Sequence, residues 1–393
     1  MTQFTKAEQV FLYLYRRALW EDVPLEASRA QNADKPTDTD APDNVALPGG
    51  SIDEATWRDV VSVAEAQTCQ GLLADALVQL PTDKRPFKAL YFSVLNVAAR
   101  AESINQKMND TLCGLFPMLQ RKGIRAWLLK GQGLAQCYPQ PLHRMAGDID
   151  VFMPYAEEFD RAVKLFECRL PGKEHEPDHH RTFFADGITI ELHGKINTHL
   201  NNRICRTFPA WLGQQMERQT VEWGDVTLPP VSFDAVYVFM HLVAHYVGGG
   251  IGLRQLADWM RFLYAHREGS RSPIDRVQLE RDVTHLGLRR LWHVFACIAV
   301  TYLGCPADVM PLYDARYRRE AAMVLRCIFD EGNFGHHDAA MKYRPKGFMA
   351  GKAFSFLVQS RRMMWNMRVF PRETLFCFPL MVRGGLERVL RRE

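Results

Sequence analysis

Apolar residues recur at helical spacing through the first third of the chain. Between residues 4 and 28 they fall three or four positions apart, which predicts an amphipathic helix. Residues 30–50 are polar, acidic and proline-bearing, and they predict a flexible loop. A second helix is expected from Ser51, where the sequence S-I-D-E fits a capping box. Residues 1–122 therefore predict a helical N-terminal region.

The pattern changes at Arg125, where short apolar runs begin to alternate with helical segments. Asp186-Gly187 separates the last two runs, and such a dipeptide between apolar stretches indicates a β-hairpin. We expect a β-α-β-α-β-β unit within residues 123–198. Its predicted elements, in chain order, are Ala126–Leu129, Gln132–Cys137, Asp148–Met153, Tyr155–Arg169, Thr182–Ala185 and Gly187–His193.

Helical spacing returns after Asn197. Ser232–Val247 and Leu253–His266 show it most clearly, and three glycines join them. The expected fold class is α+β, with a small mixed-sheet core held between helical N- and C-terminal domains. The expected units are residues 1–122, 123–198 and 199–340, followed by a basic amphipathic tail at 341–393.

Composition narrows the class of protein. The 393 residues are 47% hydrophobic, and the net charge of +4 gives no global reason to expect nucleic-acid binding. Nine cysteines occur without a C-x-x-C pair, which is typical of reduced thiols in a cytoplasmic protein. The N-terminus does not resemble a signal peptide, and the apolar run at Leu291–Leu303 is shorter than a bilayer span.

Two carboxylates lie one residue apart in the strand-like stretch G-D-I-D-V-F-M-P. Because strand side chains alternate, Asp148 and Asp150 should share a face, where they repel unless a cation or donor lies between them. The alternative is a pair of solvated aspartates at a strand end. Glu191 and His193 share a face of a later predicted strand, so Glu191 could supply a third carboxylate.

A strand running into Lys130-Gly131 precedes the two aspartates. A glycine turn that opens a helix lets backbone N–H groups approach phosphate closely, and Lys130 would add a positive charge. An ordinary strand-to-helix turn is the competing interpretation.

The order of these parts resembles the DNA polymerase β-type nucleotidyltransferase superfamily. A closer resemblance is to a bacterial family of uncharacterised nucleotidyltransferase-like proteins, carried by the runs LLKGQGLAQCYPQPLHRMAGDIDVFMP, IELHGKI and HLVAHYVGGGIGLRQLADW. It extends over about residues 85–265 and implies a nucleotidyltransferase-like core at 123–198.

The resemblance implies a role for each matching residue. Asp148, Asp150 and Glu191 would be the catalytic carboxylates and the ligands of Mg²⁺ or Mn²⁺, while Lys130, Gly131 and Arg144 would bind the nucleotide. The superfamily usually has Gly-Ser at the turn, whereas this chain has Gly131-Gln132, so Lys130 could take over phosphate binding.

The expected function is the transfer of NMP from an NTP to a hydroxyl of a small molecule, glycan or protein. A nucleic-acid acceptor is disfavoured because no polymerase-type DNA-binding module is visible. A DxD nucleotide-sugar glycosyltransferase would need a larger nucleotide-binding unit before the DxD, where residues 51–122 read as helical. A non-catalytic nucleotide-binding scaffold is the third alternative, favoured by the missing serine.

Further polar residues are candidates for the wall of a substrate cleft. His193, His241, His245, Arg254 and Asp258 belong to this group, the last four at helical i,i+4 spacing. For His241 and His245 we favour structural or substrate-facing roles over metal ligation. The spacing of Arg254 and Asp258 predicts an ion pair on the helix surface.

Two basic or histidine-rich segments allow more than one interpretation. His175, His179 and His180 could suit zinc, but their stretch reads better as a flexible polar loop. Residues 342–393 hold twelve Lys and Arg against three Glu, a net charge of +9 that leaves −5 on the rest. This tail could contact an anionic membrane or nucleic acid, and an amphipathic helix packed on the protein body is slightly favoured.

Overall fold

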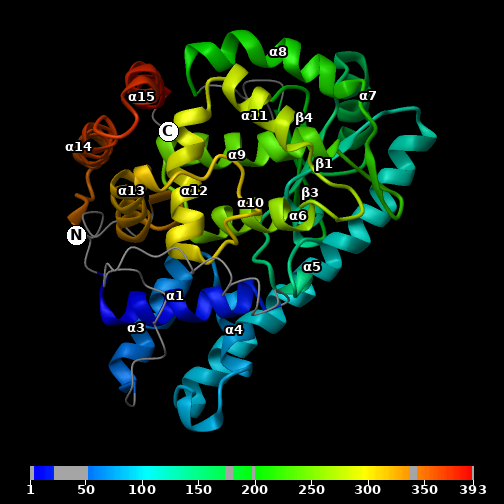
Figure 1. Ribbon diagram of the computed structural model, residues 1–393. Helices are drawn as coiled ribbons and strands as arrows, with labels where there is room; N and C mark the ends of the chain where they lie inside the picture. The colour runs from blue at the N-terminus through cyan, green and yellow to red at the C-terminus, as the bar shows by residue number, and fades with distance from the viewer. Residues whose placement is uncertain (1–3, 22–51, 173–179, 197–199, 336–342, 392–393) are drawn as a thin grey trace.

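The computed structural model describes residues 4–21, 52–172, 180–196, 200–335 and 343–391. Within them, helices flank one small mixed sheet, so the predicted α+β class is confirmed (Figure 1). The predicted loop at 30–50, Ser51, His175 and His179 lie outside the described residues. The elements before the sheet are α1 (Lys6–Leu19), α3 (Glu54–Ala66), α4 (Gln70–Val78), the 3-10 turn η3 (Thr82–Lys84) and α5 (Lys88–Arg121).

Helix α3 begins three residues after the predicted start. Its N-cap is Asp53, whose Oδ1 accepts a hydrogen bond from the Thr56 N–H at 2.7 Å. A carboxylate at this position satisfies one of the unpaired N–H groups at the helix start.

Four strands form the sheet in the order β1–β2–β4–β3. The central pair, β2 and β4, is parallel, and both outer strands run antiparallel to their neighbours. This mixed pattern follows from the chain path, because a helix returns the chain between β2 and the β3–β4 hairpin. The elements are β1 (Trp127–Leu129), α6 (Gly131–Ala135), η4 (Pro141–His143), β2 (Ile149–Phe152), α7 (Ala156–Glu167), β3 (His180–Ala185) and β4 (Ile188–His193).

The predicted hairpin at Asp186-Gly187 is confirmed. Both residues have a positive φ, 50° at Asp186 and 81° at Gly187, as a two-residue turn between twisted strands requires. Strand β3 begins at His180, two residues before the predicted start, so the interpretation of His180 as part of a loop was wrong.

The two faces of the sheet have different neighbours. Ile149 and Val151 of β2 and Ile190 of β4 point into a core shared with α5 and α7. Asp150 and Glu191 point to the other face, toward α9 and α10. The period-two alternation of the sequence therefore separates a dry face from a polar one.

Helix α5 contributes to two hydrophobic cores. Val94 and Ala98 in its first half belong to the large helical core, whereas Leu112, Phe116 and Leu119 in its second half lie in the core under the sheet. At 34 residues it is about 51 Å long.

The remaining helices build the large core around aromatic side chains. Phe239 of α9 packs 4.9 Å from Trp259 of α10 and 4.5 Å from Trp292 of α12, measured between ring centroids. Helix α9 is apolar and long enough to cross a bilayer, but 67% of it is buried in the protein, so it serves as a central core helix. The elements are α8 (Asn202–Met216), α9 (Val231–Gly248), α10 (Leu253–Ala265), α11 (Arg276–His285), α12 (Arg289–Leu303), η5 (Ala315–Tyr317), α13 (Arg318–Glu331), η6 (Asn333–Gly335), α14 (Phe348–Asn366) and α15 (Pro371–Arg391).

One hairpin lies within the region predicted to be helical. Strands β5 (Val221–Trp223) and β6 (Val226–Leu228) pair antiparallel around Gly224-Asp225, with a φ of 59° at Gly224. The Gly-Asp turn was the available signal, but strands of three residues give too short an alternation to be recognised.

Candidate active site

Three carboxylates meet in a cavity of about 880 Å³ between the sheet and helices α9 and α10. Asp150 on β2 lies opposite Glu191 on β4 in the parallel register, and Asp148 immediately precedes β2. One oxygen from each carboxylate lies within 4.8 Å of the others. Because Mg²⁺ and Mn²⁺ bind carboxylate oxygens at a little over 2 Å, one ion could contact oxygens at this spacing.

The three carboxyl groups differ in their electrostatic surroundings. Burial and the neighbouring Asp150 charge raise the pKa of Asp148. Burial would raise the pKa of Asp150 too, but Lys130 and His193 outweigh it and hold that pKa well below its usual range. A hydrogen bond from His180 lowers the pKa of Glu191. Asp150 and Glu191 are therefore ionised at neutral pH.

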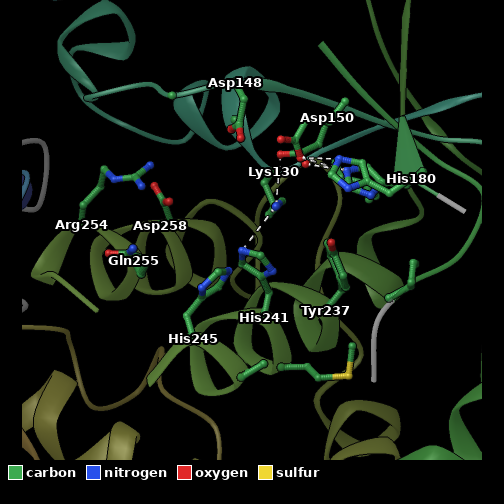
Figure 2. Close-up of a pocket in the computed structure, with 18 of the residues that line it drawn as sticks. Lys130, Asp148, Asp150, His180, Tyr237, His241, His245, Arg254, Gln255 and Asp258 are labelled. Carbon is green, nitrogen blue, oxygen red and sulfur yellow. Dashed lines mark hydrogen bonds and ion pairs between the residues drawn. The ribbon is translucent and has the colours of Figure 1, made fainter. Parts of the chain in front are cut away.

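Lys130 lies at the centre of the site (Figure 2). Its Nζ is 3.1 Å from Asp150 Oδ2 and 3.3 Å from His241 Nε2. Burial opposes the charged form, yet Asp150 and the nearby Asp148 raise the pKa of Lys130, so the ammonium persists. Burial and Lys130 push the pKa of His241 well below its usual value, so neutral His241 accepts the hydrogen bond.

The turn after β1 has an unusual backbone. Lys130 has φ 54° and ψ −136°, and Gly131 has φ 44°. A positive φ at a residue with a side chain is strained and often marks a functional site. The turn directs both the Lys130 side chain and the Gly131 backbone toward the cavity.

Gln132, the residue after the Lys130-Gly131 turn, has a structural role. Its Nε2 donates to Asn109 Oδ1 at 2.8 Å and to the Asn105 carbonyl at 3.2 Å, and the residue is buried. Both partners lie on α5, so the side chain ties the turn to that helix and does not line the cavity.

Two histidines border the carboxylates on the sheet. The rings of His180 and His193 stack 4.7 Å apart and are nearly parallel. His193 Nε2 lies 2.8 Å from Asp150 Oδ1, and His180 Nε2 lies 3.2 Å from Glu191 Oε2. Sequence reasoning placed His193 in the cleft but missed His180, whose position opposite His193 depends on the hairpin register.

Arg144 and Asp258 form a buried ion pair in the wall of the cavity. Arg144 donates from Nε and Nη2 to the two Asp258 oxygens, at 2.7 and 2.8 Å, and the Tyr138 hydroxyl donates to Oδ1 at 2.7 Å. The predicted surface pair between Arg254 and Asp258 is therefore wrong, because Asp258 is buried and bound by Arg144.

Helix α10 also brings Arg254 to the cavity. Its Nε has no hydrogen-bond partner among the described residues, and neither has the buried Nη1 of Arg144. Burial and repulsion from Arg144 lower the pKa of Arg254. Of these two guanidinium groups only Arg144 is hydrogen-bonded to Asp258, so this end of the cavity carries spare donors for an anion.

Helix α9 lines the cavity with its own histidines. The rings of His241 and His245 meet edge to face with centroids 4.3 Å apart. Burial, Lys130 and Arg254 lower the pKa of His245 to about 4, so it is neutral near pH 7. Both rings line the cavity opposite the carboxylates.

Comparison with known proteins agrees with this geometry. A family model described as an uncharacterised nucleotidyltransferase matches residues 53–304, more than half of the chain. The chain belongs to this family, and the match includes the turn, the three carboxylates and the α9–α10 wall. Searches of curated proteins and of solved structures gave no match.

Proposed function

We propose that this protein transfers NMP from an NTP to a hydroxyl group of a small molecule, glycan or protein, using Mg²⁺ or Mn²⁺. The observation that carries the proposal is the convergence of Asp148, Asp150 and Glu191 beside the Lys130-Gly131 turn. Membership of a nucleotidyltransferase family supports the reaction class. The relationship to the polymerase β-type superfamily and the cytoplasmic location are parts of the same proposal.

The side chains present fit a hard divalent cation. Three carboxylates supply oxygen donors, and the buried Asp150 would lack a balancing charge without Lys130 or a metal ion. When bound, the metal would neutralise phosphate charge and lower the pKa of the acceptor hydroxyl. Asp148, Asp150 and Glu191 would hold it.

The cations of the cavity are placed to bind a triphosphate. Lys130 and Arg254 enter the cavity from opposite sides (Figure 2). The Nη1 of Arg144 adds a buried hydrogen-bond donor. Since phosphoryl transfer depends mainly on positioning and charge neutralisation, these groups would orient the donor nucleotide.

Glu191 is the candidate base for the acceptor. Its ionised carboxylate would take the hydroxyl proton while the acceptor oxygen forms a bond to the α-phosphorus. The bond from the α-phosphorus to the bridging oxygen breaks, and pyrophosphate leaves with that electron pair. His180, within 3.2 Å of Glu191, would hold this carboxylate in place.

Label transfer from α-labelled NTPs to components of a cell extract tests the proposal. Asp148→Asn, Asp150→Asn and Glu191→Gln should each lower transfer by about a hundredfold or more, because each removes a group that stabilises the transition state. The matched control is Asp160→Asn, which changes an exposed carboxylate on α7 and should retain full transfer.

The alternatives give different results in this assay. Transfer that persists in all three variants contradicts the site. Nucleotide binding without transfer to any component indicates a scaffold. Turnover of nucleotide sugars, and not of NTPs, indicates a glycosyltransferase, although the described residues before β1 form helices only and supply no Rossmann-like unit.

A further inference from the structure

Exposed apolar side chains concentrate on the two C-terminal helices. Fifteen large hydrophobic residues are exposed in the described part of the chain, and ten of them lie between residues 343 and 380. Soluble surfaces rarely gather so many in one place without a partner. The ten are Tyr343, Phe348, Met349, Phe356, Leu357, Met364, Trp365, Leu375, Phe378 and Leu380.

Helix α14 exposes an apolar face along its length. Its exposed apolar residues recur about every seven positions, at Met349, at Phe356 and Leu357, and at Met364. This spacing places them on one side of the helix. Met349, Leu357 and Met364 are 63%, 66% and 67% exposed. The expectation of an amphipathic helix packed on the protein body fits Met363, which is buried, but it does not account for these three exposed side chains.

The attachment of α14 to the body is narrow. Arg362 pairs with Glu331 of α13 at 2.8 Å, and Tyr246 of α9 donates from its hydroxyl to Asn366 Oδ1 at 2.8 Å. Only Gly351, Met363 and Asn366 of this helix are buried. In Figure 1, α14 and α15 lie at the edge of the molecule beside α13, away from the sheet.

The charge around this apolar face has a single sign. Residues 343–385 hold eight Lys and Arg and one acid, Glu373, which is buried beside Asn201. Arg361 is exposed on α14 and Arg368 is exposed in the turn between α14 and α15, where the Arg368 guanidinium lies 5.0 Å from the Trp365 ring centroid. Cations next to exposed Trp and Phe side chains are typical of helices that lie at a lipid–water interface.

We propose that helices α14 and α15 dock the protein onto an anionic lipid surface. The apolar side chains would enter the acyl boundary while the arginines bind lipid headgroups. Residues 342–393 carry +9 and the rest of the chain −5, so an anionic surface attracts the tail and repels the body. This difference orients the molecule, and the proposal does not depend on the nucleotidyltransferase activity.

Two other occupants fit these observations less well. A second copy seated on the same face would bring its cations against those of the first, which opposes association. A nucleic acid would use the cations and could stack on aromatic rings, but it gains little from exposed Met and Leu side chains. The lipid surface uses both the charge and the aliphatic groups.

Co-sedimentation of the full-length protein with vesicles tests the proposal. We expect binding to phosphatidylcholine vesicles that contain phosphatidylserine and little binding to phosphatidylcholine alone. Raising NaCl from about 0.1 M to about 0.5 M should weaken it, since salt screens the arginines. The tryptophan emission of the protein should shift to shorter wavelength on binding, because the exposed Trp365 would enter a less polar environment.

Matched pairs of variants separate the apolar and the charged contributions. Leu357→Glu/Met364→Glu and Arg361→Gln/Arg368→Gln should each reduce binding by about tenfold or more. Val277→Glu/Arg281→Gln changes exposed residues of α11 and should leave binding unchanged. All of the altered side chains are exposed, and circular dichroism verifies that each variant is folded.

Four results would overturn the proposal. The first is equal binding to neutral and anionic vesicles. The second is vesicle binding that neither pair of tail variants changes. The third is binding to DNA, without binding to vesicles, that Leu357→Glu/Met364→Glu does not weaken. The fourth is a dimer that Leu357→Glu/Met364→Glu dissociates, in a protein that does not bind vesicles.

Discussion

Asp150 and Glu191 lie directly opposite each other in the parallel pairing of β2 with β4. Two neighbouring carboxylates repel each other unless positive charge compensates them, and the Lys130 ammonium pairs with Asp150 here. The Lys130 ammonium therefore occupies part of the space around Asp150 that a metal ion would need.

Replacing Lys130 with Met tests this competition. Without the ammonium, Mn²⁺ should bind the nucleotide-free protein about tenfold more tightly, because one competing cation leaves the Asp150 carboxylate. NTP binding should weaken at the same time, since the charge that we propose to bind phosphate is lost. Mn²⁺ electron paramagnetic resonance measures the first effect and calorimetry the second.

Lys195→Met is the control for Lys130→Met. Lys195 also lines the cavity, but it is exposed and forms no ion pair with Asp150. Mn²⁺ affinity should not change in this variant. Weaker Mn²⁺ binding by Lys130→Met would show that the ammonium supports the metal site and does not compete with it.

Asp258→Ala should destabilise the fold by about 3–5 kcal/mol. It leaves the buried Arg144 guanidinium without its bidentate partner, and a buried unpaired charge is costly. Urea denaturation measures the loss. Arg144→Met/Asp258→Leu should recover much of it. Arg316→Ala, which removes the exposed partner of Asp314, should have little effect on the unfolding curve.

Gly71→Ala should also destabilise the protein, by about 1–3 kcal/mol or more. A Cβ at Gly71 would lie 1.8 Å from the His143 carbonyl oxygen, and His143 immediately precedes Arg144. The methyl group must push η4 away from α4, so NTP binding should weaken too.

Gly114→Ala is the control for Gly71→Ala. Nothing lies within 4 Å of a Cβ at this exposed position of α5, and alanine favours a helix more than glycine does. It should be neutral or stabilising in thermal denaturation.

Asp234 gives the protein a pH-dependent stability. Burial raises the pKa of Asp234 to about 8, whereas an unfolded aspartate titrates near 3.8. The folded state holds the Asp234 proton more tightly than the unfolded state does, so protonation of this carboxyl stabilises the fold. The stabilisation is fully present below pH 3.8 and is lost as pH rises toward 8. The loss is at most about 1.4 kcal/mol per pH unit.

Asp234→Asn should remove this slope. Urea unfolding at several pH values between about 5 and 8 should show the variant gaining stability over the wild type as pH rises. Asp160→Asn, at an exposed position, should keep the wild-type slope. If the free energy of unfolding changed with pH in the same way in the wild type and in Asp234→Asn, the buried carboxyl would not be the source of the pH dependence.

The sequence predicts those parts of the site that depend on local geometry. Asp150 and Glu191 face the cavity because strand side chains alternate, and Asp186-Gly187 identifies the hairpin. The parallel pairing that brings the two carboxylates together cannot be read from either strand alone. It depends on how α7 returns the chain, which is a property of the whole sheet.

Contacts between distant segments could not be predicted in this way. Arg144 binds Asp258, 114 positions away, and not the i,i+4 neighbour that helix geometry offers to Asp258. His180 reaches Glu191 only because β3 extends two residues beyond its apolar run. Gln132 looked like a lost phosphate contact, but its amide instead fixes the Lys130-Gly131 turn to α5.

The long helix α5 has a consequence for how the protein unfolds. Its first half is packed by the large helical core and its second half by the core under the sheet. Melting either core would leave half of α5 without packing, and an isolated helix of that length is only marginally stable in water. The two cores are therefore energetically coupled through one continuous backbone, and we expect them to unfold in a single cooperative transition.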